Sequence, residues 1–399
     1  MHHSVEDEVL QLCSRARLDQ AAVDRIKGLA GEHPDWDYLC KIAQRHGMLP
    51  LLYHQLNQTA RDLVPADYLK RLKLIYQENA ARNLILNAEL LSIVQDLRAN
   101  AIESLPFKGP TLAMMAYRDL ALRCFVDLDL IVRRRDVAAA REILIARGYR
   151  PTRKLSPQQE RLLLASQHNI RFSRDEGLMI VELHWRVAAE LYSASVDEEE
   201  LWANLETITL DNVKLKTFPP EELVYSLCIH GSRHLWERLS WIGDLAALIS
   251  HGTIDWERLL QLSEKNRTEG MLFLGLQLAN DLCGASLPDH VRLRIAAGSD
   301  TKRLAIEIAE RLFRSPEYVP LSPLKTFKYN LRIRKSWSAR ARYCAFAFSP
   351  SDDDLDAIAL PRFLNFGYYL FRPIRLFRRR RAISRTSGAS IASHSRSLK

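Results

Sequence analysis

The sequence FVDLDLIV, at residues 125–132, decides how the rest of the chain can fold. It predicts a short strand, because apolar and β-branched residues surround two acids that stand two positions apart. Strand side chains alternate between faces, so we expect Asp127 and Asp129 on one face, with Cβ atoms roughly 6–7 Å apart. Two carboxylates on a core strand are costly to bury without a cation or hydrogen bonds. The pair therefore predicts a hard divalent metal, Mg²⁺, of the kind that holds a nucleoside triphosphate.

The segments around this strand predict an α/β or α+β core. Residues 102–107 are strand-like, residues 108–110 form a break, and residues 111–117 are helix formers. A helix from Arg135 closes at Gly148, a C-cap signal. Further strands are expected at residues 168–172 and 178–186, followed by a hairpin of residues 207–210 and 213–218 around Asp211-Asn212.

Helical periodicity flanks this core on both sides. Residues 5–58 carry amphipathic patterns, and a long helix is expected from Pro65 to about residue 99. Further helices are expected at residues 221–234, 241–250, 255–265, 270–283 and 302–313. The predicted divisions are an N-terminal helical region (1–100), an α/β core (101–218), a helical domain (219–315), a C-terminal helical and basic extension (316–383) and a disordered Ser/Arg-rich tail (384–399).

Composition narrows the function classes only slightly. Lys and Arg number 57 against 48 Asp and Glu, and the net charge of +9 suits phosphate-rich partners without choosing among them. Six scattered cysteines without a C-x-x-C pair favour a reducing compartment over a disulfide framework. The start of the chain is polar, and no apolar run reaches the roughly 18–20 residues of a membrane span. A cytoplasmic protein is the expectation.

Three features of the core together predict phosphoryl-transfer chemistry. Two-metal transfer needs carboxylates that bridge two cations, so that one holds the triphosphate and the other lowers the pKa of the attacking hydroxyl. Asp127 and Asp129 supply the bridging pair, and Glu182 on a later strand can complete the second site. The turn at Gly109 lets backbone N–H groups meet phosphates at a helix start, and Lys108 adds a compact positive charge.

Each of these residues also has a structural alternative. The two aspartates could form a capped turn or pair with Arg118 or Arg123, and Glu182 could pair with an arginine at a sheet edge. Lys108 could be a solvated side chain. Arg123 could clamp phosphate oxygens or neutralise the acids. His184 shares the face of Glu182, where it has either a functional role or that of a hydrogen-bonded core histidine.

The later helical stretch offers further contacts. His230 and His234 stand four residues apart on one helix face, a spacing that can bind zinc, but no third ligand is evident. Trp236, Arg238, Trp241 and Asp244 suit base stacking, phosphate contact or core packing. Near the end of the chain, an aromatic segment (363–377) precedes four arginines (378–381). It predicts either contact with an anionic membrane surface or a docked terminal helix, and no nucleic-acid reader motif accompanies it.

The segment LPFKGPTLAMMAYRDLALRCFVDLDLIV, at residues 105–132, resembles the core of an uncharacterised bacterial nucleotidyltransferase family, nucleotidyltransferase family 5. That family belongs to the DNA polymerase beta-like nucleotidyltransferase superfamily. The likeness continues through VELHW (181–185) and HGSRHLWERLSWIGDL (230–245), and reaches residues 360–361 and 371–373. Its most specific part is the combination of Lys-Gly with Asp-x-Asp.

The resemblance implies an α+β protein with a nucleotidyltransferase-type mixed sheet between N-terminal helices and a C-terminal helical domain. It implies Mg²⁺ and transfer of a nucleoside monophosphate from an NTP such as ATP to an unidentified hydroxyl or phosphate acceptor. The superfamily's metal-binding acids map onto Asp127, Asp129 and Glu182, and the helical domain could close over the substrates through His184, His230, His234, Arg238 and Asp244.

Two departures from the superfamily pattern keep an alternative open. Its usual Gly-Ser is Lys108-Gly109 here, so no serine hydroxyl stands at the turn, and the gap to Asp127 is longer. The alternative is a catalytically weak nucleotide-binding or scaffold protein, in one version associated with a membrane surface, in a polysaccharide or peptide modification pathway.

Overall fold

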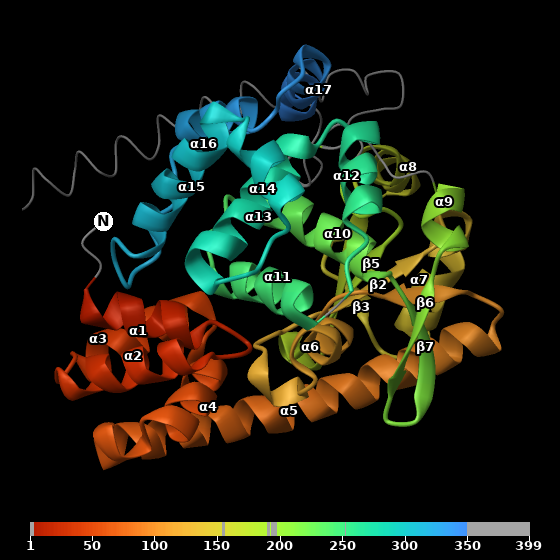
Figure 1. Ribbon diagram of the computed structural model, residues 1–399. Coiled ribbons are helices and arrows are strands. Elements are labelled where there is room, and N and C mark those ends of the chain that lie inside the picture. The colour runs from red at the N-terminus through yellow and green to blue at the C-terminus, as the bar shows by residue number, and fades with distance from the viewer. Residues whose placement is uncertain (1–3, 154–155, 190–191, 193–197, 252, 349–399) are drawn as a thin grey trace, which may run out of the picture.

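The computed structural model describes residues 4–153, 156–189, 192, 198–251 and 253–348 (Figure 1). The described chain is an α+β protein with a five-stranded mixed sheet, a separate two-stranded hairpin and helices on both sides of the sheet. The expected fold class is therefore confirmed. The aromatic and arginine-rich segments at 363–381 and the tail at 384–399 lie outside the described residues, so their expected roles stay predictions.

The five-stranded sheet has the order β1-β2-β5-β4-β3. Its strands are β1 (Ser104–Pro106), β2 (Leu128–Val132), β3 (Arg150–Pro151), β4 (Asn169–Arg174) and β5 (Met179–His184). β2 and β5 run parallel, and the other neighbours are antiparallel. β2 begins at Leu128, so Asp127 precedes the strand, although the sequence predicted both aspartates within it.

The helices follow the predicted pattern closely. The N-terminal group is α1 (Val5–Cys13), α2 (Gln20–Gly31), α3 (Trp36–His46), α4 (Leu49–Thr59) and α5 (Ala66–Ala99); α6 (Gly109–Tyr117), α7 (Val137–Ala146), α8 (Pro157–Ser166) and α9 (Glu198–Ala203) lie among the strands. The later helices are α10 (Pro220–Arg233), α11 (Leu239–His251), α12 (Trp256–Lys265), α13 (Glu269–Cys283), α14 (Asp289–Ala296), α15 (Ser299–Leu312), α16 (Pro323–Arg332) and α17 (Trp337–Phe348). The sequence did not separately predict the short α9 and α14, nor α16 and α17 within the expected C-terminal extension.

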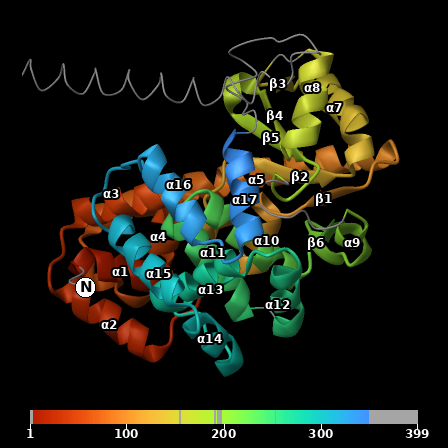
Figure 2. The same cartoon turned by 90° about the horizontal axis from the view of Figure 1, so that it is seen from above.

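The helix α5 joins two hydrophobic clusters. Its first half packs in the larger cluster with α1–α4 and α10–α15, where Leu72 is buried. Its second half, including Leu90 and Val94, packs in the smaller cluster with α7 and one face of the sheet. Figures 1 and 2 show α5 running from the N-terminal helices to the end of the molecule that holds α7 and the sheet. Leu128 and Leu130 of β2 face this smaller cluster, so Asp129, between them, faces the opposite side.

The predicted hairpin is β6 (Glu206–Leu210) with β7 (Val213–Thr217). Its turn residues Asp211 and Asn212 have φ angles of 45° and 64°, the left-handed region that a two-residue type I′ turn requires. Asn87 of α5 donates a hydrogen bond to Asp211 at 2.6 Å, which holds the hairpin against α5.

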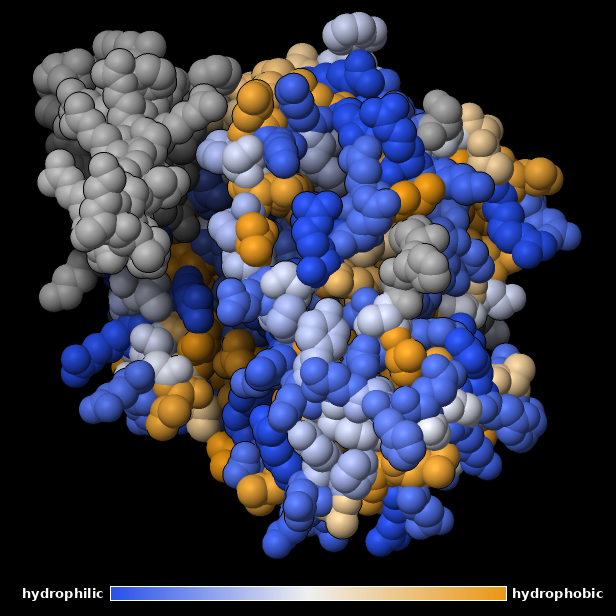
Figure 3. Space-filling model, turned by 90° about the vertical axis from the view of Figure 1, so that its left-hand side faces the viewer, coloured by the Kyte–Doolittle hydropathy of each residue, from blue (hydrophilic) through white to orange (hydrophobic). Residues whose placement is uncertain are grey.

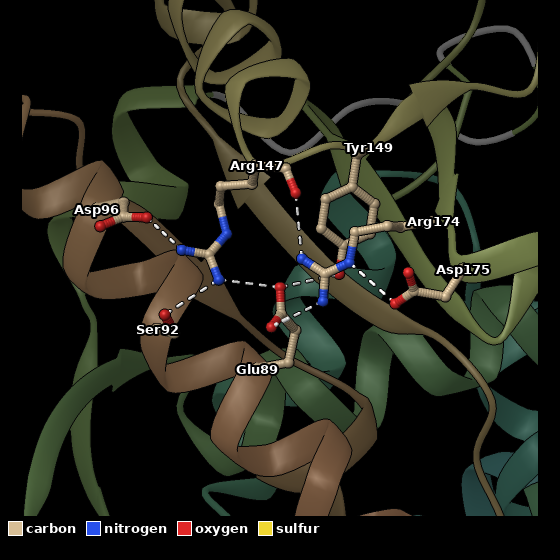
Figure 4. Close-up of polar contacts among 7 residues, drawn as sticks. All are labelled: Glu89, Ser92, Asp96, Arg147, Tyr149, Arg174 and Asp175. Carbon is tan, nitrogen blue, oxygen red and sulfur yellow. Dashed lines mark hydrogen bonds and ion pairs between the residues drawn. The ribbon is translucent and has the colours of Figure 1, made fainter.

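A polar network fastens the far edge of the sheet to α5 (Figure 4). Glu89 of α5 accepts hydrogen bonds from Arg147 at 3.0 Å and from the Tyr149 hydroxyl at 3.1 Å, and its other oxygen lies 3.2 Å from Arg174. Asp96 also pairs with Arg147. These contacts fix the end of β4 relative to the helix beneath the sheet.

The outer face of the N-terminal helices is mainly hydrophilic, with hydrophobic residues in scattered groups (Figure 3). This surface is what amphipathic helices leave exposed when their apolar sides form the core. Within the part of the chain that the structure describes, no helix has both the length and the apolar character to span a bilayer.

Candidate active site

A cavity of about 1150 Å³ lies between the sheet and the helices α10 and α11. Its floor is the sheet face opposite α5, and alternate residues of the strands point into it, as a period of two requires. These floor residues are Asp129 of β2, Ile180, Glu182 and His184 of β5, and Asn169, Arg171 and Ser173 of β4. Its roof consists of Ile229, His230, Arg233, His234, Arg238 and Trp241.

Asp129 and Glu182 are direct neighbours on the parallel strands β2 and β5. His184 places Nε2 3.0 Å from Asp129 Oδ1 and 3.4 Å from Glu182 Oε2. Lys108 Nζ donates a hydrogen bond to the same Asp129 oxygen at 3.3 Å, and Asn169 donates to Glu182 Oε2 at 2.8 Å. The structure therefore brings four of the predicted residues, Lys108, Asp129, Glu182 and His184, into one cluster.

The two aspartates of the cavity, Asp127 and Asp129, have pKa values that are shifted in opposite directions. Burial and the charges of Asp129 and Glu182 raise the pKa of Asp127 to about 6. Burial alone would also raise the pKa of Asp129, but the charge of Lys108 and the hydrogen bond from His184 outweigh it and lower that pKa. Asp129 is thus held as a carboxylate, whereas Asp127 takes up a proton readily in the absence of a further cation.

The Lys-Gly turn requires glycine for two reasons. Gly109 has a φ angle of 54°, in the left-handed region, where it begins α6. A Cβ at this position would also lie 3.2 Å from the backbone oxygen of Asp127. The turn therefore packs directly against the segment that carries the acid. Gly109 itself is not among the described residues that line the cavity, whereas Lys108 is.

The acid centre fits a divalent metal. Asp129, Glu182 and His184 each offer one ligand atom, and these atoms lie within 4.8 Å of one another. Carboxylate oxygens suit hard cations such as Mg²⁺, and the imidazole nitrogen widens the choice to metals such as Mn²⁺. Asp127 lines the same cavity and offers a further carboxylate.

Three aromatic rings of the roof form a cluster beside the acids. The ring centres of His230 and His234 lie 4.7 Å apart, and those of His230 and Trp241 lie 5.1 Å apart. Burial, then the charge of Arg233, lowers the pKa of His234 to about 4, and burial together with Lys108 lowers the pKa of His230. Both histidines are therefore neutral near pH 7, and neither belongs to the metal-ligand grouping among the described residues.

Arg123 and Asp244 form a buried ion pair beneath one wall of the cavity. Arg123 Nε donates to Asp244 Oδ2 at 3.0 Å, and the Tyr117 hydroxyl donates to Asp244 Oδ1 at 3.0 Å. Arg123 also lines the cavity, but Asp244 is not among the described lining residues. Arg123 thus forms its ion pair with Asp244, while Asp129 forms one with Lys108. Arg238, on the roof, is exposed and lines the cavity.

Several polar residues of the cavity were not among those predicted from the sequence. Asn169, which holds Glu182, and Arg171 lie on the strand that the sequence predicted at 168–172. His168 contacts the Arg233 guanidinium, and its ring centre lies 5.7 Å from that of His184. The alternation of Asn169, Arg171 and Ser173 on one face was a usable signal. The sequence did not indicate which residue of this strand lies opposite Glu182, because that register depends on which strands pair.

The mixed sheet with helices on both sides is a fold of the nucleotidyltransferase type. Residues 32–284 match the family model described as uncharacterised nucleotidyltransferase, and the chain belongs to this family. The resemblance that the Lys-Gly and Asp-x-Asp motifs indicated is thereby confirmed. No curated protein and no solved structure matches the chain.

Proposed function

We propose that this protein is a divalent-metal-dependent nucleotidyltransferase that moves a nucleoside monophosphate from an NTP to a hydroxyl or phosphate acceptor. The observation that carries the proposal is the cross-strand pair of Asp129 and Glu182, in one cavity with Asp127 and Lys108. A cavity that holds several acids beside a lysine and a helix start suits a triphosphate with its cations.

Asp127, Asp129 and Glu182 would hold Mg²⁺, with His184 as a further ligand or a hydrogen-bond donor to the two acids. When bound, the metal neutralises the triphosphate and lowers the pKa of the attacking hydroxyl. Glu182 accepts the hydroxyl proton, and Asn169 and His184 hold its carboxylate in place. Lys108 binds phosphate oxygens from the side of the turn.

The roof suits the nucleotide's base. Trp241 and the neutral rings of His230 and His234 offer flat surfaces on which a base can stack. Base–aromatic stacking is tolerant of base identity, so these rings do not choose which NTP is used. Arg238, which lines the exposed part of the roof, would contact phosphate oxygens.

The test compares wild type with Asp129→Asn, using Mg²⁺ and each labelled NTP over a broad acceptor screen. We expect pyrophosphate release and labelled product from wild type, and a loss of at least about a hundredfold in the variant because a metal-binding charge is gone. Asp62→Asn removes the same charge from an exposed residue outside the cavity and serves as the control. Equal turnover, or equal metal-dependent nucleotide binding, in wild type and Asp129→Asn contradicts the proposal.

One observation favours a second candidate, a nucleotide-binding protein without turnover. The ammonium of Lys108 already stands 3.3 Å from Asp129, in the position of a cation, and the chain has Lys108-Gly109 where the superfamily usually has Gly-Ser. Metal-dependent NTP binding without pyrophosphate release over the whole acceptor screen distinguishes this candidate.

A further inference from the structure

Four residues form a row across the floor of the cavity. Asp129 pairs with Glu182 across β2 and β5, and Glu182 pairs with Arg171 across β5 and β4. The backbone N–H of Thr152, just after β3, donates to the Arg171 carbonyl at 3.0 Å, which extends the row by one strand. Cross-strand partners project from the same face, roughly 5 Å apart, so Arg171 stands beside Glu182 on the side away from Asp129.

The Arg171 side chain has no polar partner within the described part of the chain. It is exposed on the floor of the cavity, and its guanidinium makes no hydrogen bond or ion pair with the residues that the structure describes. Opposite charges directly across a sheet normally attract each other. Here, however, the side chains of Arg171 and Glu182 form no ion pair in the described structure; Glu182 Oε2 instead accepts a hydrogen bond from Asn169 at 2.8 Å and lies 3.4 Å from His184 Nε2. The guanidinium is thus available to a ligand.

The cavity has room for two ligands. Its volume of about 1150 Å³ exceeds the usual 300–1,000 Å³ of a site for one small molecule. Lys108 and Arg123 belong to the side of β1 and β2, whereas Arg171, Ser173 and Thr152 belong to the side of β4 and β3. Glu182, the proposed proton acceptor, lies between these two sides.

We infer that the acceptor carries an anionic group, a phosphate or a carboxylate, and that Arg171 receives it. This inference rests on the proposed function and names the class of its second substrate. A planar guanidinium binds such groups with two parallel hydrogen bonds, which orients the acceptor as well as holding it. The hydroxyls of Ser173 and Thr152, which line the same side, can donate to the same oxygens.

In this arrangement the anionic group does not react. The acceptor hydroxyl oxygen forms a bond to the α-phosphorus of the NTP, and the bond from that phosphorus to the pyrophosphate oxygen breaks. The hydroxyl proton passes to Glu182, and pyrophosphate leaves with the electron pair of the broken bond. Arg171 is therefore a specificity-determining residue, whose effect falls on acceptor binding.

The first experiment offers wild type pairs of acceptors that differ only in the anionic group: glycerol and glycerol phosphate, a hexose and its phosphate, and an N-acetylserine ester and the free acid. We expect transfer to the anionic member of at least one pair and little transfer to its neutral partner. Arg171→Gln should raise KM for that acceptor by about tenfold to a hundredfold, with KM for the NTP unchanged. The KM of Arg171→Lys for that acceptor should lie between those of wild type and Arg171→Gln.

The control is Arg161→Gln, which removes the same charge from an exposed arginine of α8 that does not line the cavity. Preference for the neutral acceptors overturns the inference. A rise in KM for the NTP in Arg171→Gln also overturns it, since the arginine would then serve the nucleotide.

A second experiment does not depend on turnover. Binding of inorganic phosphate and binding of acetate are measured separately by calorimetry, with the metal and a non-hydrolysable NTP present at saturation. If the NTP does not bind, the same titrations are made without the metal and NTP. Wild type should bind at least one of the two anions, and Arg171→Gln should weaken that binding at least tenfold, whereas Arg161→Gln should not. Equal binding by the two variants contradicts the inference. Failure of the metal and NTP to bind contradicts only the proposed function.

Discussion

The ammonium of Lys108 lies 3.3 Å from Oδ1 of Asp129, so the lysine and the acid form an ion pair inside the cavity. Both side chains are largely buried, with exposed fractions of 14% and 5%. A metal that binds Asp129 must share this carboxylate with Lys108, and a triphosphate that binds Lys108 draws the ammonium away from it. The two events therefore assist each other.

Replacing Lys108 by methionine should change the affinity for the metal alone and the affinity for the metal–NTP complex in opposite directions. Metal binding without nucleotide should strengthen several-fold, because the competing cation is gone, whereas binding of the metal–NTP complex should weaken about tenfold. Calorimetric titration with Mn²⁺, alone and with NTP, measures both. Lys70→Met, in an exposed position of α5, is the matched control. Weaker binding of the metal alone would count against competition at Asp129.

Asp127 should make the metal-free protein less stable as the pH rises. Its pKa is raised to about 6 from an ordinary 3.8, so the folded state binds the proton more tightly than the unfolded state. The stability that this proton contributes is present at low pH and is lost as the pH rises through about 6.

We therefore expect metal-free Asp127→Asn to exceed wild type by about 1–3 kcal/mol in free energy of unfolding at pH 7.5. The difference should shrink toward pH 4. Denaturant titrations across this range, with and without Mg²⁺, provide the measurement. Excess Mg²⁺ should reverse the order, since it stabilises wild type more. A difference that does not change with pH would contradict the raised pKa.

Gly109→Ala should disturb both the backbone and the acid. The positive φ angle opposes alanine by about 1–2 kcal/mol, and the new Cβ would press on the Asp127 carbonyl from 3.2 Å. We expect lower stability together with weaker metal binding. Gly148→Ala is the control, because Gly148 has a φ angle of 85° but lies at the end of α7, outside the cavity. If both variants bind metal equally, the turn does not position Asp127.

Glu89→Gln tests the network that fastens the sheet to α5 (Figure 4). Burial alone would raise the pKa of Glu89, but hydrogen bonds from Arg147 and Arg174 lower it below its ordinary 4.5. Its stabilising contribution is therefore present above that value and is lost as the pH falls through the lowered pKa.

The free energy of unfolding of Glu89→Gln should be about 1–3 kcal/mol lower than that of wild type at pH 7, because two arginines lose their shared partner. The two free energies should converge at acid pH. Thermal unfolding followed from pH 7 to pH 3 measures the effect. Asp175→Asn, which removes an exposed partner of Arg174, should have little effect. Similar losses in both variants would show that the network is not centred on Glu89.

Local patterns accounted for most of the secondary structure. Pro65 and the apolar stripes after it predicted α5 almost to the residue, and Gly148 correctly predicted the end of α7. Asp211-Asn212 likewise predicted a turn whose angles the structure confirms. Each of these signals depends on a residue's own backbone preference, which is visible in the sequence.

The site was predictable only in part, because its geometry depends on pairing between distant segments. The spacing of Asp127 and Asp129 predicted an acid pair, but not that β2 starts at Leu128. The motif suggested Glu182 as a third acid, yet nothing local placed His184 between the acids. The position of Arg171 follows from strand order and register, which single-sequence patterns do not specify.

The helix α5 has a consequence for how this protein comes apart. It is 34 residues long, about 50 Å, and its two halves belong to two different hydrophobic clusters. If one cluster unfolds, α5 loses apolar contacts along half of its length, and the other cluster depends on α5 remaining helical. A molecule with two cores should therefore unfold in a single transition, and a break in the middle of α5 should divide that transition into two.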